Sequence, residues 1–156
     1  MKNKILGLML VFVISPEIMA SQFIQPIIQG KIYSDLDIPI KSLGEPRKVI
    51  KGQYDECNGD YFPDEYSYGT FTVLETGVIK EVYLNQGNEL LFHGQKVQAG
   101  MDQKRFMQQF KKYNLWTNSE NKNVVYSRLF EDGNDSIEFI FKNRKLLKYK
   151  LFFDDC

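Results

Sequence analysis

Short runs of alternating apolar and polar residues, separated by turn residues, constrain this chain more than any other feature. Two glycine-containing turns, Glu75-Thr76-Gly77 and Asp132-Gly133-Asn134, are hairpin signals. Strands joined by a tight hairpin pair antiparallel, so we expect an antiparallel sheet. The runs that predict strands are Lys48 to Tyr54, Tyr66 to Leu74, Val78 to Leu84, Val124 to Phe130, Ser136 to Phe141 and Leu146 to Phe153.

Two segments have the apolar spacing of a helix. The first begins near Ser34 to Asp37, carries Leu36, Ile40 and Leu43, and ends at Gly44 and Pro46. The second opens at Gly100-Met101-Asp102 and carries a stripe of aromatic residues, which we assign to the core: Phe106, Phe110 and Tyr113. Each predicted helix precedes a group of predicted strands.

This order predicts an α+β fold, in which an antiparallel β-sheet carries two helices packed on one face. The hairpin from Phe71 to Leu84 is similar in pattern to the one from Ile137 to Leu151. A tandem α-βββ repeat over residues 30–90 and 95–153 is therefore a hypothesis. The 136 residues from 21 to 156 suit a single domain with a substantial core.

The N-terminus has the three parts of a secretory signal peptide: Lys2 and Lys4, an apolar run from Ile5 to Ile14, and a polar exit from Ser15 to Ala20. That apolar run is too short for a membrane span. We expect residues 1–20 to be removed after Ala20, or alternatively after Ser21, and the mature protein to be periplasmic or secreted.

Two cysteines, Cys57 and Cys156, lie in the part expected to be exported. An oxidising compartment favours a disulfide between them, with two unpaired thiols as the alternative. A bridge over nearly 100 residues would stabilise the fold by roughly 4–5 kcal/mol in the chain-entropy model.

Few residues offer catalytic chemistry. His93 is the one histidine, and no Gly-x-Ser-x-Gly elbow accompanies it, so we predict a non-enzyme; a hydrolase using His93 or paired carboxylates is the alternative. One histidine and two distant cysteines do not make a zinc site, and no phosphate-binding loop occurs, so we expect no metal and no cofactor. The 20 basic and 20 acidic residues of the whole chain argue against nucleic acid.

Residues 54–68 form the most informative segment, because acidic and aromatic residues alternate there and no Lys or Arg occurs from Gly52 to Ile79. Asn, Gly and Pro predict a loop. Tyrosine supplies contact area at low entropic cost, and acidic charge speeds the encounter with a basic partner. The predicted partner-binding residues are Asp55, Glu56, Asp60, Tyr61, Phe62, Asp64, Glu65 and Tyr66.

A Cys57–Cys156 bridge would also bring Asp154 and Asp155 beside this segment. The alternatives for the segment are a solvated acidic loop whose aromatics cover the end of the sheet, and a calcium site, although the spacing does not match an EF-hand.

The layout resembles a group of exported bacterial domains: the β-lactamase inhibitor proteins, in which the unit is used in tandem, and the small outer-membrane assembly lipoproteins of the SmpA/OmlA type. The resemblance rests on Leu43-Gly44-Glu45-Pro46, the hairpin from Phe71 to Leu84, and the second unit from Gly100 to Leu151. It implies protein binding: inhibition of an extracytoplasmic enzyme, or an immunity protein that blocks a toxin. An envelope assembly or structural module is the alternative, although this chain lacks the lipid-bearing cysteine. The oligomeric state stays open.

Overall fold

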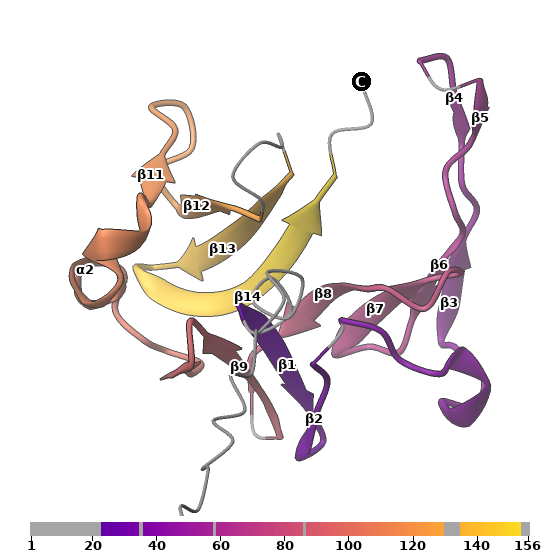
Figure 1. The fold of residues 1–156 in the computed structure, drawn as a ribbon, viewed down its shortest axis with the longest axis horizontal. Coiled ribbons are helices and arrows are strands. Elements are labelled where there is room, and N and C mark those ends of the chain that lie inside the picture. The colour runs from indigo at the N-terminus through magenta and orange to yellow at the C-terminus, as the bar shows by residue number, and fades with distance from the viewer. Residues whose placement is uncertain (1–22, 35, 58, 86, 130–134, 154–156) are drawn as a thin grey trace, which may run out of the picture.

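The computed structural model describes residues 23–34, 36–57, 59–85, 87–129 and 135–153. Within these residues the fold is built from antiparallel strands, one α-helix and two short 3-10 turns (Figure 1). The strands are β1 (Ile24–Ile28), β2 (Lys31–Ile32), β3 (Lys48–Ile50), β4 (Tyr54–Asp55), β5 (Asp60–Tyr61), β6 (Glu65–Ser67), β7 (Phe71–Leu74), β8 (Ile79–Tyr83), β9 (Asn88–Phe92), β10 (Gln95–Val97), β11 (Trp116–Thr117), β12 (Val124–Arg128), β13 (Ser136–Lys142) and β14 (Lys145–Phe152). The helical elements are η1 (Ile40–Ser42), α2 (Gln103–Gln109) and η2 (Lys111–Tyr113).

The expected α+β fold with two helices on one face is wrong, because the first predicted helix is not helical. Its backbone groups bond across to the turn before β8 and to the start of that strand: the Ile38 N–H donates to the Gly77 carbonyl (2.9 Å), and the Leu36 carbonyl accepts from the Ile79 N–H (2.8 Å). Backbone groups used in this way are not available to an i to i+4 ladder. Leu36, Ile40 and Leu43 of the predicted stripe are partly buried against the core, but the conformation is a loop that contains only η1, and its fully buried residue is Ile38, which the stripe did not include.

The second predicted helix is present as α2. Asp102 is its N-cap, and its carboxylate accepts the N–H groups of Lys104 (3.0 Å) and Arg105 (3.4 Å). Phe106 and Phe110 are fully buried. Among the described residues, no helix is long and apolar enough to cross a membrane.

Two sheets make up the body of the protein. The larger has the order β11-β12-β13-β14-β8-β7-β6-β3, and the smaller has the order β10-β9-β1-β2. Both orders are symmetrical about a central antiparallel pair, β14 with β8 and β1 with β9. Each half of the chain therefore supplies a hairpin, then a helical turn or helix, then a four-stranded meander.

This topology replaces the hypothesised α-βββ unit, because the first half has no α-helix and each half begins with a hairpin that the sequence pattern did not predict. The turns of those two hairpins are Gln29-Gly30 and His93-Gly94, and all four residues have positive φ. That conformation is typical of two-residue hairpin turns.

The predicted strands are mostly present, with one clear exception. The run from Tyr66 to Leu74 is not one strand, because the chain reverses at Gly69, whose φ is +93°, and Tyr68 donates its N–H to the Phe71 carbonyl. Strands β6 and β7 on either side pair with each other. The strands β1, β2, β5, β9, β10 and β11 were not predicted.

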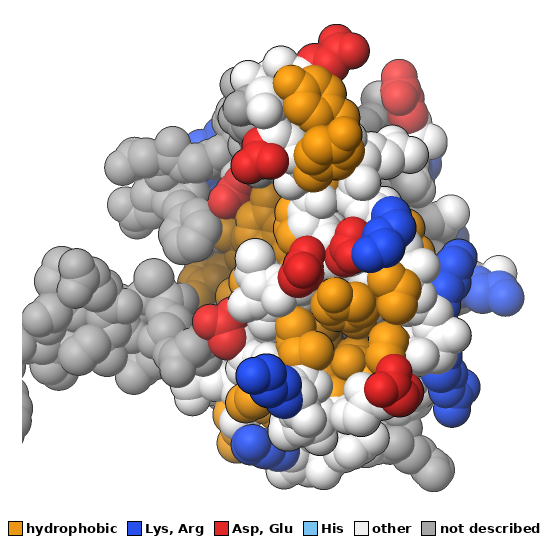
Figure 2. All heavy atoms as spheres, turned by 90° about the vertical axis from the view of Figure 1, so that its right-hand side faces the viewer, with side chains coloured by type: hydrophobic (Ala, Val, Ile, Leu, Met, Phe, Trp, Pro, Cys, Tyr) orange, Lys and Arg blue, Asp and Glu red, His pale blue; other side chains and the backbone are white. Residues whose placement is uncertain are grey.

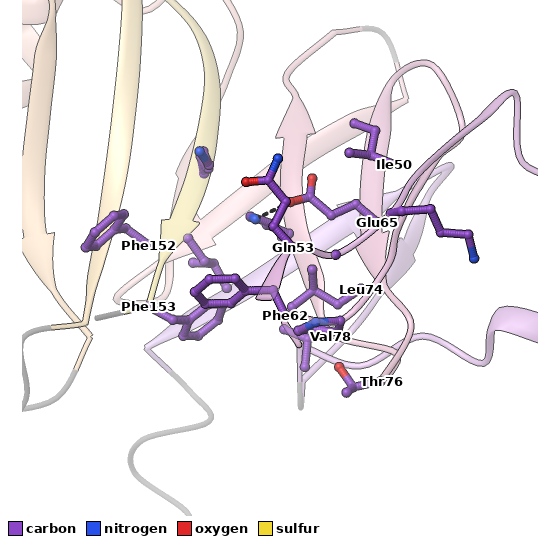
Figure 3. A pocket seen from close by; sticks show the side chains of 15 residues that line it. Ile50, Gln53, Phe62, Glu65, Leu74, Thr76, Val78, Phe152 and Phe153 are labelled. Carbon is purple, nitrogen blue, oxygen red and sulfur yellow. Dashed lines mark hydrogen bonds and ion pairs between the residues drawn. The ribbon is translucent and has the colours of Figure 1, made fainter. Parts of the chain in front are cut away.

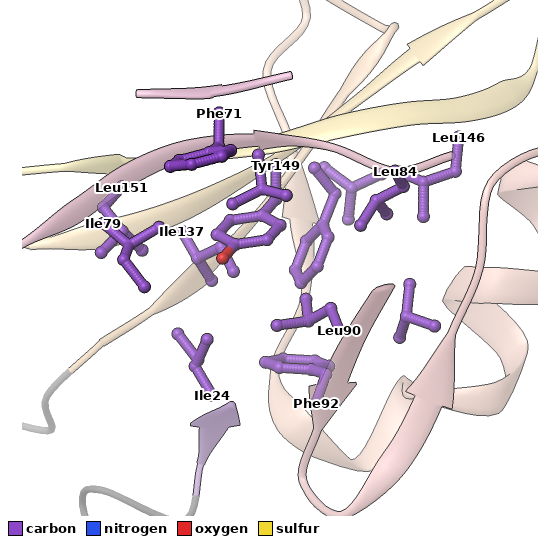
Figure 4. Packing of buried hydrophobic residues seen from close by; sticks show 14 of the residues in the cluster. Ile24, Phe71, Ile79, Leu84, Leu90, Phe92, Ile137, Leu146, Tyr149 and Leu151 are labelled. Carbon is purple, nitrogen blue, oxygen red and sulfur yellow. The ribbon is translucent and has the colours of Figure 1, made fainter. Parts of the chain in front are cut away.

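The core lies between the two sheets and α2 (Figure 4). Leu90 and Phe92 of the small sheet face Tyr149 and Ile137 of the large one. Burial raises the pKa of the Tyr149 hydroxyl well above its usual range. The sheets thus close around one apolar interior, and α2 lies at the end of the molecule opposite β4 and β5 (Figure 1).

Candidate functional site

Residues 48–57 and 59–67 form a projecting hairpin, which we call the arm. Strand β3 pairs with β6 (Val49 with Tyr66), and β4 pairs with β5 (Tyr54 with Tyr61), in one continuous register. The base of the arm is the edge of the large sheet, and its tip extends away from the body of the molecule (Figure 1). The acidic segment predicted as a loop is therefore an extended hairpin.

The middle of the arm is held together by Asp64. Its carboxylate accepts the Gly52 N–H (3.0 Å) and forms an ion pair with Lys51 (2.5 Å). These contacts hold the pKa of Asp64 below its usual range and raise that of Lys51. The two legs approach so closely here that a Cβ atom at position 52 would lie 1.6 Å from the Phe62 carbonyl oxygen. Only glycine fits that approach.

The tip carries two exposed tyrosines. The rings of Tyr54 and Tyr61 meet edge to face with centroids 5.3 Å apart, and the residues are 54% and 69% exposed. Glu56 and Asp60 are exposed on the turn beside them. Figure 2 shows hydrophobic side chains gathered at the end of the molecule that carries the arm, with acidic side chains nearby. The tip is an amphipathic, negatively charged surface.

A groove of about 590 Å³ lies where the base of the arm meets the end of β14 (Figure 3). Ile50 and Phe62 come from the first and second segments of the arm, and Phe152 and Phe153 come from the end of β14. Leu74 and Val78, which flank the β7–β8 turn, add to the apolar lining, as do Pro63 and Leu151.

Three lysines line the same groove. Lys51 is paired with Asp64, and Lys80 is paired with Glu65 at 2.5 Å. Lys150 differs, because no carboxylate of the described residues lies within ion-pair distance of its ammonium group. The groove is therefore apolar with one cation that has no ion-pair partner in that part of the chain.

The structure separates the predicted partner-binding residues into groups. Glu56, Asp60 and Tyr61 lie at the exposed tip, and Phe62 lines the groove. Asp55 is buried and its carboxylate accepts the Cys57 N–H (3.0 Å), so it shapes the turn.

The remaining three predicted residues lie below the tip. Asp64 and Glu65 are engaged by lysines, as described above. Tyr66 is paired in register with Val49 on one side and with the buried Val73 on the other, so it lies on the same face of the sheet as Val73 and is half-buried. The accessible part of the predicted set is thus smaller than the sequence suggested.

Sequence reasoning missed the C-terminal side of the groove. Phe152 and Phe153 stand out in sequence as two apolar residues at the end of a predicted strand. Their place beside the arm depends on the pairing of β14 with β8 and on the strand order, which the local pattern does not contain.

Of the two cysteines in the predicted disulfide, one lies within the described residues and the other lies outside them. Cys57 is exposed in the turn after β4, whereas Cys156, Asp154 and Asp155 lie outside the described residues. The bridge, and the two carboxylates it would bring to the tip, stay predictions. The predicted signal peptide and the whole predicted turn Asp132-Gly133-Asn134 also fall outside the described part.

His93 lies far from the arm, in the turn between β9 and β10. Its ring stacks on Tyr113 with centroids 3.3 Å apart and an interplanar angle of 6°. Burial, with a smaller effect of Lys112, lowers the pKa of His93 to about 4. Its Nε2 atom is buried, with no hydrogen-bond partner among the described residues. The imidazole is therefore neutral at physiological pH and packs as an aromatic ring.

His93 also lines a cavity of about 660 Å³ together with Trp116 and Arg128. No three His, Cys, Asp or Glu side chains of the described residues come close enough to hold a metal ion.

No protein-family model, curated protein or solved structure matches this chain. The resemblance to the inhibitor and assembly domains therefore stays a hypothesis from the sequence.

Proposed function

We propose that this is an exported binding protein that inhibits or neutralises another extracytoplasmic protein, and that it contacts this partner through the tip of the arm. The observation that carries the proposal is the exposed pair Tyr54 and Tyr61 at the end of a braced hairpin. Large aromatic side chains cost free energy when they are left in water, and they are the residues that dominate protein interfaces.

Exposed apolar side chains are concentrated in this region. Of the nine large hydrophobic residues that are exposed in the described structure, six belong to the arm or the groove: Val49, Ile50, Tyr54, Tyr61, Phe62 and Phe152. Apolar surface gathered in one place and rimmed by charge is typical of an interaction site.

The charge of the tip favours a basic partner surface. Glu56 and Asp60 are exposed, and no Lys or Arg of the described residues forms an ion pair with either. Opposite charge on a partner would accelerate association more than it would raise affinity. Export to the periplasm or medium, which the N-terminal sequence predicts, would let the partner be a secreted enzyme or an incoming toxin.

The test uses the purified protein as bait in an extracytoplasmic extract of the source cells, with identification of what is retained. The triple variant Glu56→Lys, Asp60→Lys, Tyr61→Ala should lose at least ~90% of the retained partner, because it removes both the charge and the central contact area. Glu120→Lys, an exposed charge reversal in the loop after β11, is the matched control and should retain it.

Once a partner is identified, the effect of this protein on the partner's activity distinguishes an inhibitor from an assembly module. Inhibition of its enzymatic or toxic activity by the wild-type protein, reduced in the triple variant, supports the proposal. If the wild type and the triple variant captured the partner equally, the tip would not be part of the interface. Stable retention of membrane proteins without effect on any activity would favour an assembly module instead.

A further inference from the structure

We propose that the groove at the base of the arm is a second contact site, which accepts a leucine or aromatic side chain of the partner together with a carboxylate adjacent to it. This inference rests on the proposed function, because the occupant is a segment of the same partner protein. It goes beyond the tip contact by naming the chemistry that the partner must present.

Three segments of the chain converge on the groove and supply its exposed apolar surface. Ile50, Phe62 and Phe152 are 43%, 42% and 47% exposed, so each leaves a large part of its surface in water. They come from β3, from the second leg of the arm and from β14, and Figure 3 shows them around the same open space. A volume of about 590 Å³ is ample for one bulky side chain and its flanking backbone.

Lys150 supplies a positive charge to the groove. Its neighbours across the sheet are Glu138 and Glu81, and Glu81 is already bound by Lys148 at 2.7 Å. Glu138 forms no ion pair with Lys150 within 4.0 Å. The other two groove lysines are paired, so Lys150 is the groove lysine that no carboxylate of the described residues engages, and it can meet a carboxylate of the occupant.

The groove and the tip therefore favour opposite charges on one partner. The tip is acidic and faces a basic surface, whereas the groove is apolar with a lysine and faces an apolar residue next to an acidic one. Because both surfaces belong to the same arm, one partner segment can contact them together. Such paired, opposite requirements provide specificity against proteins that are merely basic.

The test needs no knowledge of the partner. Three blocked dipeptides, acetyl-Leu-Asp-amide, acetyl-Leu-Lys-amide and acetyl-Ala-Asp-amide, are titrated into the isotopically labelled protein while backbone amide shifts are followed by NMR. We expect the first to shift the amides of Ile50, Phe62 and Phe152, with about two- to fivefold tighter binding than acetyl-Leu-Lys-amide, as an exposed ion pair provides. Acetyl-Ala-Asp-amide should bind at least about threefold more weakly, because most of the apolar contact is missing.

Two variants and one control separate the contribution of the Lys150 charge from that of the apolar lining. Lys150→Met keeps the aliphatic stem and should reduce the preference for Asp over Lys to about onefold, while binding still depends on leucine. Lys104→Met, an exposed lysine on α2, should leave the preference unchanged. Phe152→Ser should weaken acetyl-Leu-Asp-amide severalfold, and because Phe152 is about half exposed this variant should fold.

Absence of shifts at the groove, equal binding of the Asp and Lys probes, or a preference that survives in Lys150→Met would each overturn the inference. A concentration-dependent dimer of the wild type that Phe152→Ser abolishes would identify a second copy of the chain as the occupant and would also overturn it. These outcomes are independent of the capture experiment, so the groove and the tip can fail separately.

Discussion

Two clusters of aromatic rings lie at opposite ends of this protein and have opposite surroundings. Phe106 of α2 and Phe139 of β13 pack with ring centroids 4.5 Å apart and are fully buried. Tyr54 and Tyr61 at the tip of the arm pack at 5.3 Å and are more than half exposed. Ring contacts of similar geometry thus hold the fold together at one end, whereas at the other they shape a surface that is still open to a partner.

The largest expected effect breaks the buried cluster. Phe106→Ala should lower the free energy of unfolding by about 3–5 kcal/mol, because it removes a fully buried ring that contacts Phe92, Phe110 and Phe139. Urea denaturation followed by circular dichroism measures it. Tyr61→Ala is the comparison and should cost less than about 1 kcal/mol. A similar loss in both variants would contradict the contrast between the two clusters.

The next largest effect is expected where the two strands of the arm approach most closely, at Gly52 and Phe62. Gly52→Ala should lower the local stability of the arm by about 1–3 kcal/mol, because the added methyl group has no room beside the Phe62 carbonyl. The measurement is amide hydrogen exchange at Phe62, whose N–H donates to the Gln53 carbonyl at 2.9 Å. Exchange at Val82 in the core should be unchanged. Gln53→Ala, an exposed neighbour, is the control and should leave the protection of Phe62 in place.

A smaller effect is expected at the rim of the buried cluster. The folded pKa of His93, about 4, lies below its ordinary value of 6.5, so the unfolded state binds more protons between these two values. Stability should therefore be highest above pH 6.5 and fall by about 1 kcal/mol as the pH drops toward 4, a modest amount because water partly screens the half-buried ring.

Denaturant titrations at pH 7.5 and pH 4.5 measure this difference for His93. The control is His93→Asn, which suits the positive φ of 49° and has no imidazole. The wild type should lose about 1 kcal/mol more than this variant between the two pH values. Equal losses would show that His93 does not contribute to the pH dependence.

The smallest effect on stability is expected at the tip. Glu56→Gln should change the free energy of unfolding by less than about 0.5 kcal/mol, because Glu56 is exposed and forms no ion pair with the described residues. The same variant should slow association with a captured basic partner, by about two- to threefold at low salt, in a stopped-flow or surface-binding experiment. A stability loss above 1 kcal/mol would mean that the acidic tip serves the fold.

Local features predicted the parts of the fold that depend on neighbouring residues. The hairpins β7–β8 and β13–β14 follow from alternation and turn residues, and α2 follows from Asp102 and the stripe that includes Phe106 and Phe110. The helix expected around Ile38 failed because its backbone bonds to residues near β8, about 40 positions away. No pattern within the segment contains that partner.

The candidate site divides in the same way. The mixture of acidic and aromatic residues in positions 54–68 is a property of the sequence, and it predicted a partner-binding loop where the structure has the hairpin of the arm. Which of its carboxylates are accessible was decided by tertiary structure: Asp64 and Glu65 bind lysines, and Asp55 is buried in the turn, which leaves Glu56 and Asp60 exposed. The groove likewise exists only because β14 lies next to β8, which brings Phe152 to Phe62. Alternation and turn chemistry act over a few residues, whereas ion pairs, burial and strand order depend on groups that folding brings together from distant parts of the chain.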